Sequence, residues 1–201
     1  GLRVSSAADD GANFAIAQGI RTELKALSAV NQGLNNAKGV GKVALAGATG
    51  VSNLLGDIRA KLTELSNEGI TQDQRDILDT DLASLLGQAE DFITNSSFNG
   101  VNLLDDFATT GITGVTTLSG LDGGTLTVTG HDIETTRANL LAADTSTAAL
   151  AQTALGAGAE FELFETAVNT ALGGIGADVR ALDLQTDFLQ EITAATEEGL
   201  G

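Results

Sequence analysis

The fold is decided by residues 51–65, which read VSNLLGDIRAKLTEL. Apolar side chains recur there at spacings of four and three, at Val51, Leu55, Ile58, Leu62 and Leu65. This spacing places them on one face of an α-helix. A second set upstream has the same kind of spacing, at Ile20, Leu24, Leu27 and Leu34. Leu34 and Val51 are two heptads plus three positions apart, so the two sets are out of phase. We therefore expect one long helix over about residues 7–66, with its later half facing a different partner.

The start of this helix is predicted by Ser6 and Asp9, which have the spacing of a capping box. Its middle contains four glycines, at Gly39, Gly41, Gly47 and Gly50. Each costs about 1 kcal/mol of helix propensity relative to Ala. Tertiary packing must compensate, and close approach of another backbone at the glycines is one way to do so.

The residues after Leu65 predict a turn and a shorter helix over about residues 71–94. Gly69 lies in the turn, and Thr71 and Gln74 form a second capping-box pattern. The apolar positions of the shorter helix are Leu78, Leu82, Leu85, Ala89 and Phe92. Because the turn is short, we expect this helix to fold back antiparallel on the stretch that ends at Leu65.

The region of about residues 107–135 predicts a β-hairpin. Gly111-Ile112-Thr113 and the alternating Thr125–Thr129 flank the turn signal Asp122-Gly123-Gly124. A helical pattern returns over about residues 147–198, which is ~75 Å of helix at ~1.5 Å per residue. The predicted fold is mainly α: an elongated rod of long antiparallel helices with a shorter third helix and a small β-hairpin, in one domain over residues 1–201.

The composition excludes several classes of partner. The formal net charge is −17 with only 10 Lys and Arg, which disfavours nucleic acid and anionic membranes. No window approaches the ~18 apolar residues of a membrane span. Cysteine is absent, so disulfides and thiolate metal sites are excluded.

No residue is predicted to be catalytic, to bind a cofactor or to ligate a metal. His131 is the single histidine, and we expect it on a surface turn because it has no partner for a metal site or a catalytic triad. Six acidic residues are interpreted as a solvated face because they lack the spacing of an EF-hand: Glu64, Glu68, Asp73, Asp76, Asp79 and Asp81. The threonines of residues 109–117 favour β-structure and leave O-linked glycosylation open.

Three segments carry a family resemblance. Residues 1–12 read GLRVSSAADDGA and are continued by Ala15-Ile16-Ala17, residues 97–104 read SFNGVNLL, and residues 182–189 read LDLQTDFL. The first two closely resemble signatures of bacterial flagellins, particularly the compact α-proteobacterial kind, and the third resembles their returning helix more loosely.

The resemblance implies a flagellin core without the two terminal segments, secreted and extracellular, as a self-assembling structural subunit of the flagellar filament and not an enzyme. It implies copies of itself as partners, together with an export chaperone and cap proteins. Two alternatives stay open, a hook–filament junction protein and a flagellin homologue that acts as a surface adhesin or polysaccharide receptor. Without the terminal segments, the chain is expected to be monomeric or weakly associated in dilute solution, with association growing as salt screens its charge.

The resemblance also bears on innate immune detection. Flagellins that activate the flagellin-sensing Toll-like receptor share an LQRVRELA-like block late in the first helix. The matching residues 55–62 read LGDIRAKL, which keeps Arg59 but has Asp57 in place of an arginine. Reversing that charge predicts weak receptor activation.

Overall fold

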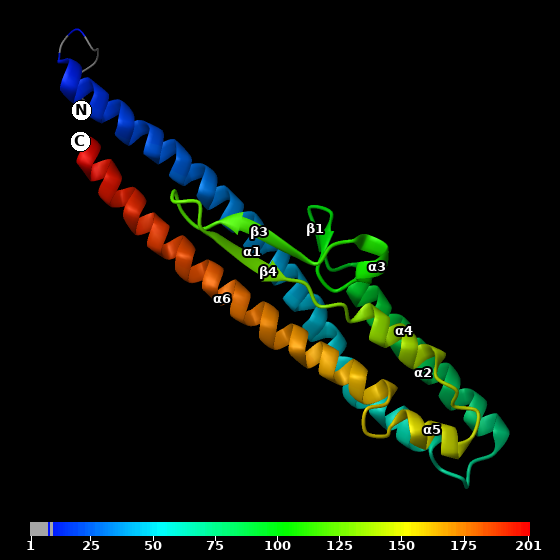
Figure 1. Ribbon diagram of the computed structural model, residues 1–201. Helices are drawn as coiled ribbons and strands as arrows, with labels where there is room; N and C mark the ends of the chain where they lie inside the picture. The colour runs from blue at the N-terminus through cyan, green and yellow to red at the C-terminus, as the bar shows by residue number, and fades with distance from the viewer. Residues whose placement is uncertain (1–7, 9) are drawn as a thin grey trace. The chain divides into compact units, whose positions relative to one another are not determined.

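The computed structural model describes Ala8 and residues 10–201. Two helices run through most of the chain, α1 (Gly11–Leu65) and α6 (Glu160–Leu200). The chain divides into two compact units, each of which includes part of both helices (Figure 1). Unit 1 contains the described residues up to Gly39 together with Val115–Val128 and Asp178–Gly201. Unit 2 contains Val40–Gly114 and Thr129–Ala177.

Helix α1 begins later than the sequence predicted. Asp10 precedes the helix, and its Oδ1 accepts a hydrogen bond from the backbone N–H of Asn13 at 3.2 Å, as an N-cap residue does. The predicted capping pair, Ser6 and Asp9, lies outside the described residues. Buried side chains follow along α1 at spacings of three and four, at Leu27, Val30, Leu34, Ala37, Val40, Ala44, Ala48, Val51, Leu55, Ile58, Leu62 and Leu65. Small residues between Leu34 and Val51 therefore carry the change of phase.

In unit 2, helix α2 (Gln72–Thr94) lies antiparallel to the later half of α1, as predicted (Figure 1). Thr71 and Gln74 form the predicted capping box. Lys61 Nζ lies 3.5 Å from a carboxylate oxygen of Asp81. Nearer the other end of α2, the Phe92 ring lies over Gly50, where an added Cβ would meet it at 3.0 Å. Gly50 thus allows close packing of α2 on α1, which compensates for its low helix propensity.

The buried face of α2 is wider than the predicted one. It consists of Arg75, Leu82, Leu86, Ala89 and Ile93, whereas the predicted Leu78, Leu85 and Phe92 are only half-buried. The reason is a second neighbour, because α4 (Glu134–Ala142) also packs against α2. Arg137 of α4 is buried between charged partners, with Glu134 at 2.6 Å and Glu90 at 3.6 Å. Its hydrogen bond with Glu134 raises the pKa of Arg137.

A short connection of two strands and one helical turn follows α2. Strands β1 (Ser97–Phe98) and β2 (Val101–Asn102) pair antiparallel. Asn99 and Gly100 join them with φ of 50° and 77°, the left-handed conformation that the Asn-Gly pair tolerates. The helix α3 (Phe107–Thr110) is capped by Asp106, whose carboxylate accepts hydrogen bonds from the Thr109 hydroxyl and the Ala108 backbone N–H. These bonds lower the pKa of Asp106.

The predicted continuous helix over residues 147–198 is two helices. Helix α5 (Ala148–Ala154) is separated from α6 by a turn that contains Gly156 and Gly158. Gly158 has a φ of 72°, which interrupts helical geometry and which L-residues rarely adopt. Thr147 caps α5 by accepting from the backbone N–H of Leu150 at 3.2 Å. The apolar periodicity continues across the break, which is why spacing alone did not reveal it.

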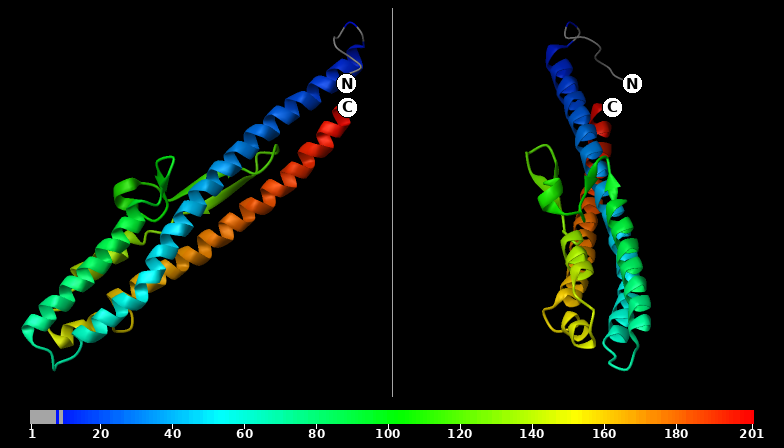
Figure 2. Two further views of the ribbon diagram at one scale, coloured as in Figure 1. Left: turned by 180° about the vertical axis from the view of Figure 1, so that it is seen from behind. Right: turned by 90° about the vertical axis from the view of Figure 1, so that its right-hand side faces the viewer.

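The hairpin consists of β3 (Gly114–Leu118) and β4 (Thr125–Thr129), and its residues 115–128 belong to unit 1. The predicted first strand, residues 111–113, instead precedes β3, because Gly111 ends α3 with a φ of 68°. The hydroxyls of Thr116 and Thr127 form a cross-strand hydrogen bond of 2.8 Å. Figure 2 shows the hairpin from two further sides.

Three contacts hold the hairpin, α1 and α6 together within unit 1. Thr117 covers Gly33 of α1, and Gln185 of α6 donates a side-chain hydrogen bond to the carbonyl of Ser119. Lys38 and Asp183 form an ion pair of 3.3 Å between α1 and α6. The first half of α1 therefore contacts the hairpin, whereas the later half contacts α2, so the predicted change of partner is confirmed.

Candidate functional site

The described residues provide little for catalysis or metal binding. No group of three or more His, Cys, Asp or Glu residues among them could hold a metal ion. The six acidic residues predicted to form a solvated face lie at the α1–α2 corner, and all except half-buried Asp79 are exposed. Asp79 accepts a hydrogen bond of 2.5 Å from the Thr145 hydroxyl, which ties this carboxylate to the loop before α5. The exposed apolar surfaces are therefore the candidates for a functional site.

His131 is not on a surface turn, in contrast to the prediction. Its side chain is half-buried, and its backbone N–H donates to the carbonyl of Leu103 at 2.7 Å. The ring lies against Gly174 of α6, where an added Cβ would meet Nε2 at 2.6 Å. The lack of a side chain at Gly174 makes room for the imidazole. His131 therefore has a packing role in unit 2.

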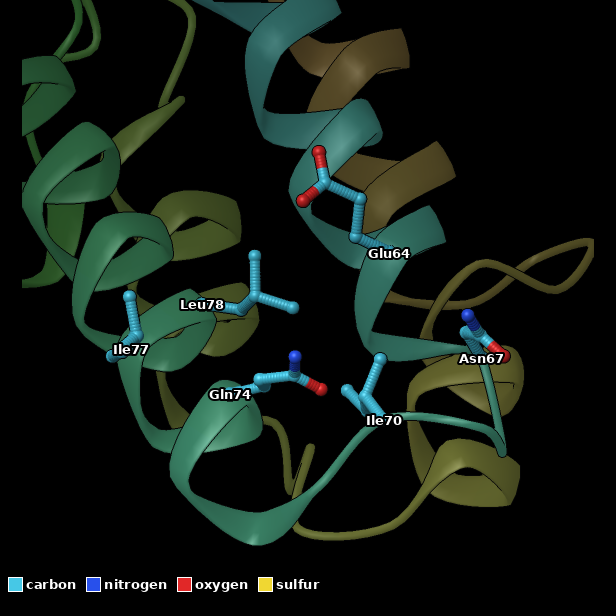
Figure 3. Close-up of a pocket in the computed structure, with 6 residues that line it drawn as sticks. All are labelled: Glu64, Asn67, Ile70, Gln74, Ile77 and Leu78. Atoms are coloured by element: carbon cyan, nitrogen blue, oxygen red, sulfur yellow. The ribbon is translucent and has the colours of Figure 1, made fainter.

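The first candidate surface is a groove at the corner of unit 2, where α1 ends and α2 begins. The groove has a volume of about 410 Å³ and is drawn in Figure 3. Its lining combines aliphatic and polar side chains: Glu64, Asn67, Ile70, Gln74, Ile77 and Leu78. Ile77 is 63% exposed, although the opposite face of α2 is well buried. We call these six residues the corner groove.

A buried arginine holds the corner in shape. Arg75 is only 6% exposed, and one guanidinium nitrogen donates to the carbonyl of Leu65 at 2.7 Å. Further hydrogen bonds reach the carbonyls of Asn67 at 3.3 Å and Thr145 at 3.4 Å. The cation thus caps the carboxyl end of α1, where the helix dipole favours positive charge. This fixes the direction in which α2 leaves the turn, and with it the position of Ile77.

The second candidate surface is a hollow of unit 1 between the hairpin and α1. It has a volume of about 440 Å³. Its lining contains no charged side chain: Ala26, Ala29, Val30, Thr117, Leu118, Gly120, Leu121 and Gly123. Leu118 and Leu121 are 48% and 49% exposed. We call these eight residues the hairpin hollow.

Neither surface is predicted from the sequence. The burial of Arg75, however, could have been predicted. Arg75, Leu82 and Ala89 are seven residues apart, so Arg75 occupies a position that the helical repeat assigns to the buried face. A charged residue at such a position indicates a buried partner, here the end of α1. Ile77 lies outside the predicted apolar face of α2, so the helical repeat gives it no buried position.

No described helix combines the length and apolar character needed to cross a membrane.

Comparison with known proteins gives consistent relatives. Residues 1–109 match the family described as the bacterial flagellin N-terminal helical region. Flagellin FljK of Caulobacter vibrioides is 29% identical over 205 residues, which cover 100% of this chain and 71% of FljK. A flagellin of Brucella melitensis is 27% identical over 210 residues, which cover 100% of this chain and 73% of the relative.

Two solved structures have a similar fold. A putative flagellar hook-associated protein from Vibrio parahaemolyticus gives a TM-score of 0.75 at 16% identity, with 98% of this chain and 99% of that chain covered. Bacillus cereus flagellin gives a TM-score of 0.56 at 21% identity, with 82% and 88% covered. At these identities the likeness is evidence for the fold alone. It confirms the predicted mainly helical class with a small β-hairpin.

Proposed function

The chain belongs to the bacterial flagellin family and is a structural subunit of the flagellar filament, and on this premise we propose that it polymerises with copies of itself outside the cell. The observation that carries the proposal is the extent of the family match. The family region covers residues 1–109, and the Caulobacter and Brucella flagellins align with the whole chain. Assembly, and not chemistry, is then the role of its surfaces.

The exposed surfaces support assembly. Large apolar side chains are exposed in both units, among them Ile77 in unit 2 and Leu118, Leu121, Leu184 and Phe188 in unit 1. Leu118 and Leu121 line one hollow together, and contiguous exposed apolar patches mark interaction sites. A formal net charge of −17 opposes contact between copies at low salt, so association requires either screening or local charge complementarity.

Sedimentation velocity over a range of protein concentrations, at low and at high salt, tests the proposal. We expect association to increase with salt, because screening weakens the repulsion between acidic chains. Electron microscopy of the associated species should show ordered, elongated assemblies. A chain that remains monomeric at every concentration and salt would contradict self-assembly by this sequence.

Two further partners and the secreted location are part of the proposal. Filament subunits of this family are proposed to meet an export chaperone before secretion and cap proteins at the growing end. Pull-down of the chain with the flagellar chaperones and cap protein of the same bacterium is the direct test. Neither interaction requires a catalytic residue, and we propose that the chain has no enzymatic role.

Weak activation of the flagellin-sensing Toll-like receptor is proposed from one position. Asp57 and Arg59 are both exposed on α1, and the guanidinium of Arg59 lies 5.8 Å from the centre of the Phe161 ring. A receptor that selects an arginine at position 57 meets a carboxylate there instead. A reporter-cell assay should give a stronger response for Asp57→Arg than for the unmodified chain. Equal responses would show that the negative charge of Asp57 does not cause weak receptor activation.

The alternative of a hook–filament junction protein gains no specific support. The similarity to the Vibrio hook-associated protein is structural, at 16% identity, and both kinds of protein share the fold. Among residues 10–201 no surface favours the adhesin alternative either, because their exposed cations Lys25, Lys42, Arg59 and Arg180 are dispersed along two helices. Acidic polysaccharides would require them to be clustered.

A further inference from the structure

We propose that Ile77 of one chain inserts into the hairpin hollow of a second copy, with the acidic residues beside Ile77 facing the cations beside the hollow. The proposal rests on the proposed function, since it names the surfaces through which the subunits meet. It pairs a surface of unit 2 with a surface of unit 1 on another molecule. The occupant of the hollow is therefore a second copy of this chain.

The inserting surface is a ridge on α2. Asp73, Ile77 and Asp81 are four residues apart and lie on one side of the helix. Asp76 is adjacent, and all four residues are exposed. Asp81 shares its charge with Lys61 at 3.5 Å, whereas no basic side chain lines the corner groove beside Ile77. The ridge is thus an apolar side chain with carboxylates on both sides.

Two cations lie along one ridge beside the receiving surface, whereas the exposed Glu23 lies on the neighbouring ridge, three residues before the lining residue Ala26. Arg21, Lys25 and Ala29 are also four residues apart, along one ridge of α1. Ala29 lines the hollow, so Lys25 is the next side chain along the ridge from the apolar lining, and Arg21 follows it. Asp122, at the tip of the hairpin, accepts the N–H of Gly124 at 3.0 Å, which turns this carboxylate toward its own loop.

Shape and charge favour the same pairing. The hollow is lined by Ala, Gly, Val, Thr and Leu, which leaves room for an aliphatic side chain and offers no charge that must be desolvated. Carboxylates beside Ile77 and cations beside Ala29 give the complementarity that fixes the register of an interface. In a chain with net charge −17, this is a place where two copies attract each other locally.

The symmetry of filaments supports a pairing of two different surfaces. A contact between unlike patches is heterologous, and it repeats from subunit to subunit without closing unless the rotation forms a ring. A contact of Ile77 with its own counterpart would be isologous and would stop at a dimer. It would also bring Asp73 and Asp76 of two copies together.

Cysteine cross-linking tests the pairing because the chain contains no cysteine. Purified Ile77→Cys and Leu118→Cys variants are mixed at a concentration and salt that give association, and then oxidised. A disulfide forms only where the two Cβ atoms approach to about 4 Å. As the control, Leu163→Cys replaces Ile77→Cys, since Leu163 is also in unit 2 and 51% exposed but lies outside both surfaces. Circular dichroism verifies that each variant is folded.

We expect at least about tenfold more mixed dimer for the Ile77→Cys and Leu118→Cys mixture than for the control. Lys25→Asp in the Leu118→Cys chain should lower the yield, and Asp73→Lys in the Ile77→Cys chain should restore it. Equal yields for the test and control mixtures overturn the pairing. If the unmodified chain still sediments as an assembly in that case, only the pairing fails. If it does not assemble under any condition, the proposed function fails as well.

Discussion

The two units use the same two helices but bury them to different extents. In unit 2, the later half of α1 has a buried residue in every turn from Val40 to Leu65, and α2 and α4 add further layers. In unit 1, residues 11–26 of α1 and residues 190–200 of α6 contain no buried residue. In the described part of unit 1, the core comes from the hairpin and a short length of paired helix. Burial, and not helix propensity, accounts for most helix stability in proteins, so unit 1 should open more readily than unit 2.

The strongest test of this difference is the same substitution at a buried leucine in each unit. Leu82→Asp in unit 2 should cost several kcal/mol of unfolding free energy, because a charge replaces an apolar side chain that is 5% exposed. Leu189→Asp in unit 1, at a site 3% exposed, should mainly remove protection from the hairpin and the end of α6. Thermal unfolding measures the global loss of stability expected for Leu82→Asp. Native-state hydrogen exchange measures the local loss of protection expected for Leu189→Asp.

Leu163→Asp is the control for both variants, since Leu163 is 51% exposed and the change should stay within about 0.5 kcal/mol. An unchanged melting temperature for Leu82→Asp would mean that this face of α2 is not buried. Global unfolding by Leu189→Asp would mean that the two units unfold together. This would contradict the expectation that unit 1 opens more readily than unit 2.

A smaller effect is expected at the corner of unit 2 from Arg75→Met. Methionine keeps much of the side-chain length but removes the donors to the carbonyls of Leu65 and Asn67. Loss of these hydrogen bonds from a buried cation should destabilise the chain by about 1–3 kcal/mol. Chemical denaturation gives the value, and Arg180→Met at an exposed position of α6 is the matched control. If both variants have the same stability, Arg75 does not hold the corner.

Three glycine-to-alanine changes along α1 should affect stability differently: one should destabilise the chain, one should have little effect and one should stabilise it. At Gly47 in unit 2, the new Cβ would lie 2.9 Å from the Cβ of Ser96, and overpacking should cost about 1–3 kcal/mol before the gain in helix propensity. At Gly33 in unit 1, the obstacle is the Thr117 hydroxyl at 2.6 Å, which can rotate, so little net change is expected. At Gly56 nothing lies within 4 Å, so alanine should stabilise by up to about 1 kcal/mol.

Melting temperatures of these three variants order them directly. Stabilisation by Gly47→Ala would show that unit 2 is packed less closely than the structure indicates, which would weaken the contrast with unit 1.

The smallest expected effect is on acid stability, and it concerns unit 2. The hydrogen bond from Thr109 and the backbone N–H of Ala108 lower the pKa of Asp106 below its unfolded value of about 4. The cap therefore stabilises the fold above that pH, and the contribution is lost as pH falls through the lowered folded pKa. Titration of the Asp106 carboxyl by NMR, with Asp106→Asn as the comparison in acid unfolding, measures it. A pKa at or above the ordinary value would contradict the cap.

The sequence predicted the parts of the fold that depend on repeated spacing. The later half of α1, the capping box at Thr71 and the antiparallel α2 follow from apolar periodicity and one turn. The break before α6 was missed because Ala154 and Phe161, on either side of it, are seven residues apart, which preserves the phase of a continuous helix. In the structure, the positive φ of Gly158 and the bounds of α5 and α6 show the break.

The candidate surfaces could not be predicted in the same way. A pattern argument finds buried faces, whereas Ile77 and the hairpin hollow are defined by what the fold leaves uncovered. The hollow also joins Ala29 to Leu118 and Leu121, which are far apart in the sequence. His131 was placed on the surface because nothing in the sequence connects it to Gly174. These contacts are long-range, and one sequence carries no local signal for them.

The contacts between α1 and α2 have a consequence for the lengths that related chains can have. Two contacts join these antiparallel helices: the Phe92 ring lies over Gly50, and Asp81 lies beside Lys61. One residue inserted into α2 between these two contacts would rotate the rest of the helix by about 100°, so that Phe92 would no longer face Gly50. An insertion at residues 67–70, or at the hairpin tip, would leave both contacts between α1 and α2 intact. Insertions and deletions that accumulate during evolution should therefore be found in these turns and be absent from the paired lengths of helix.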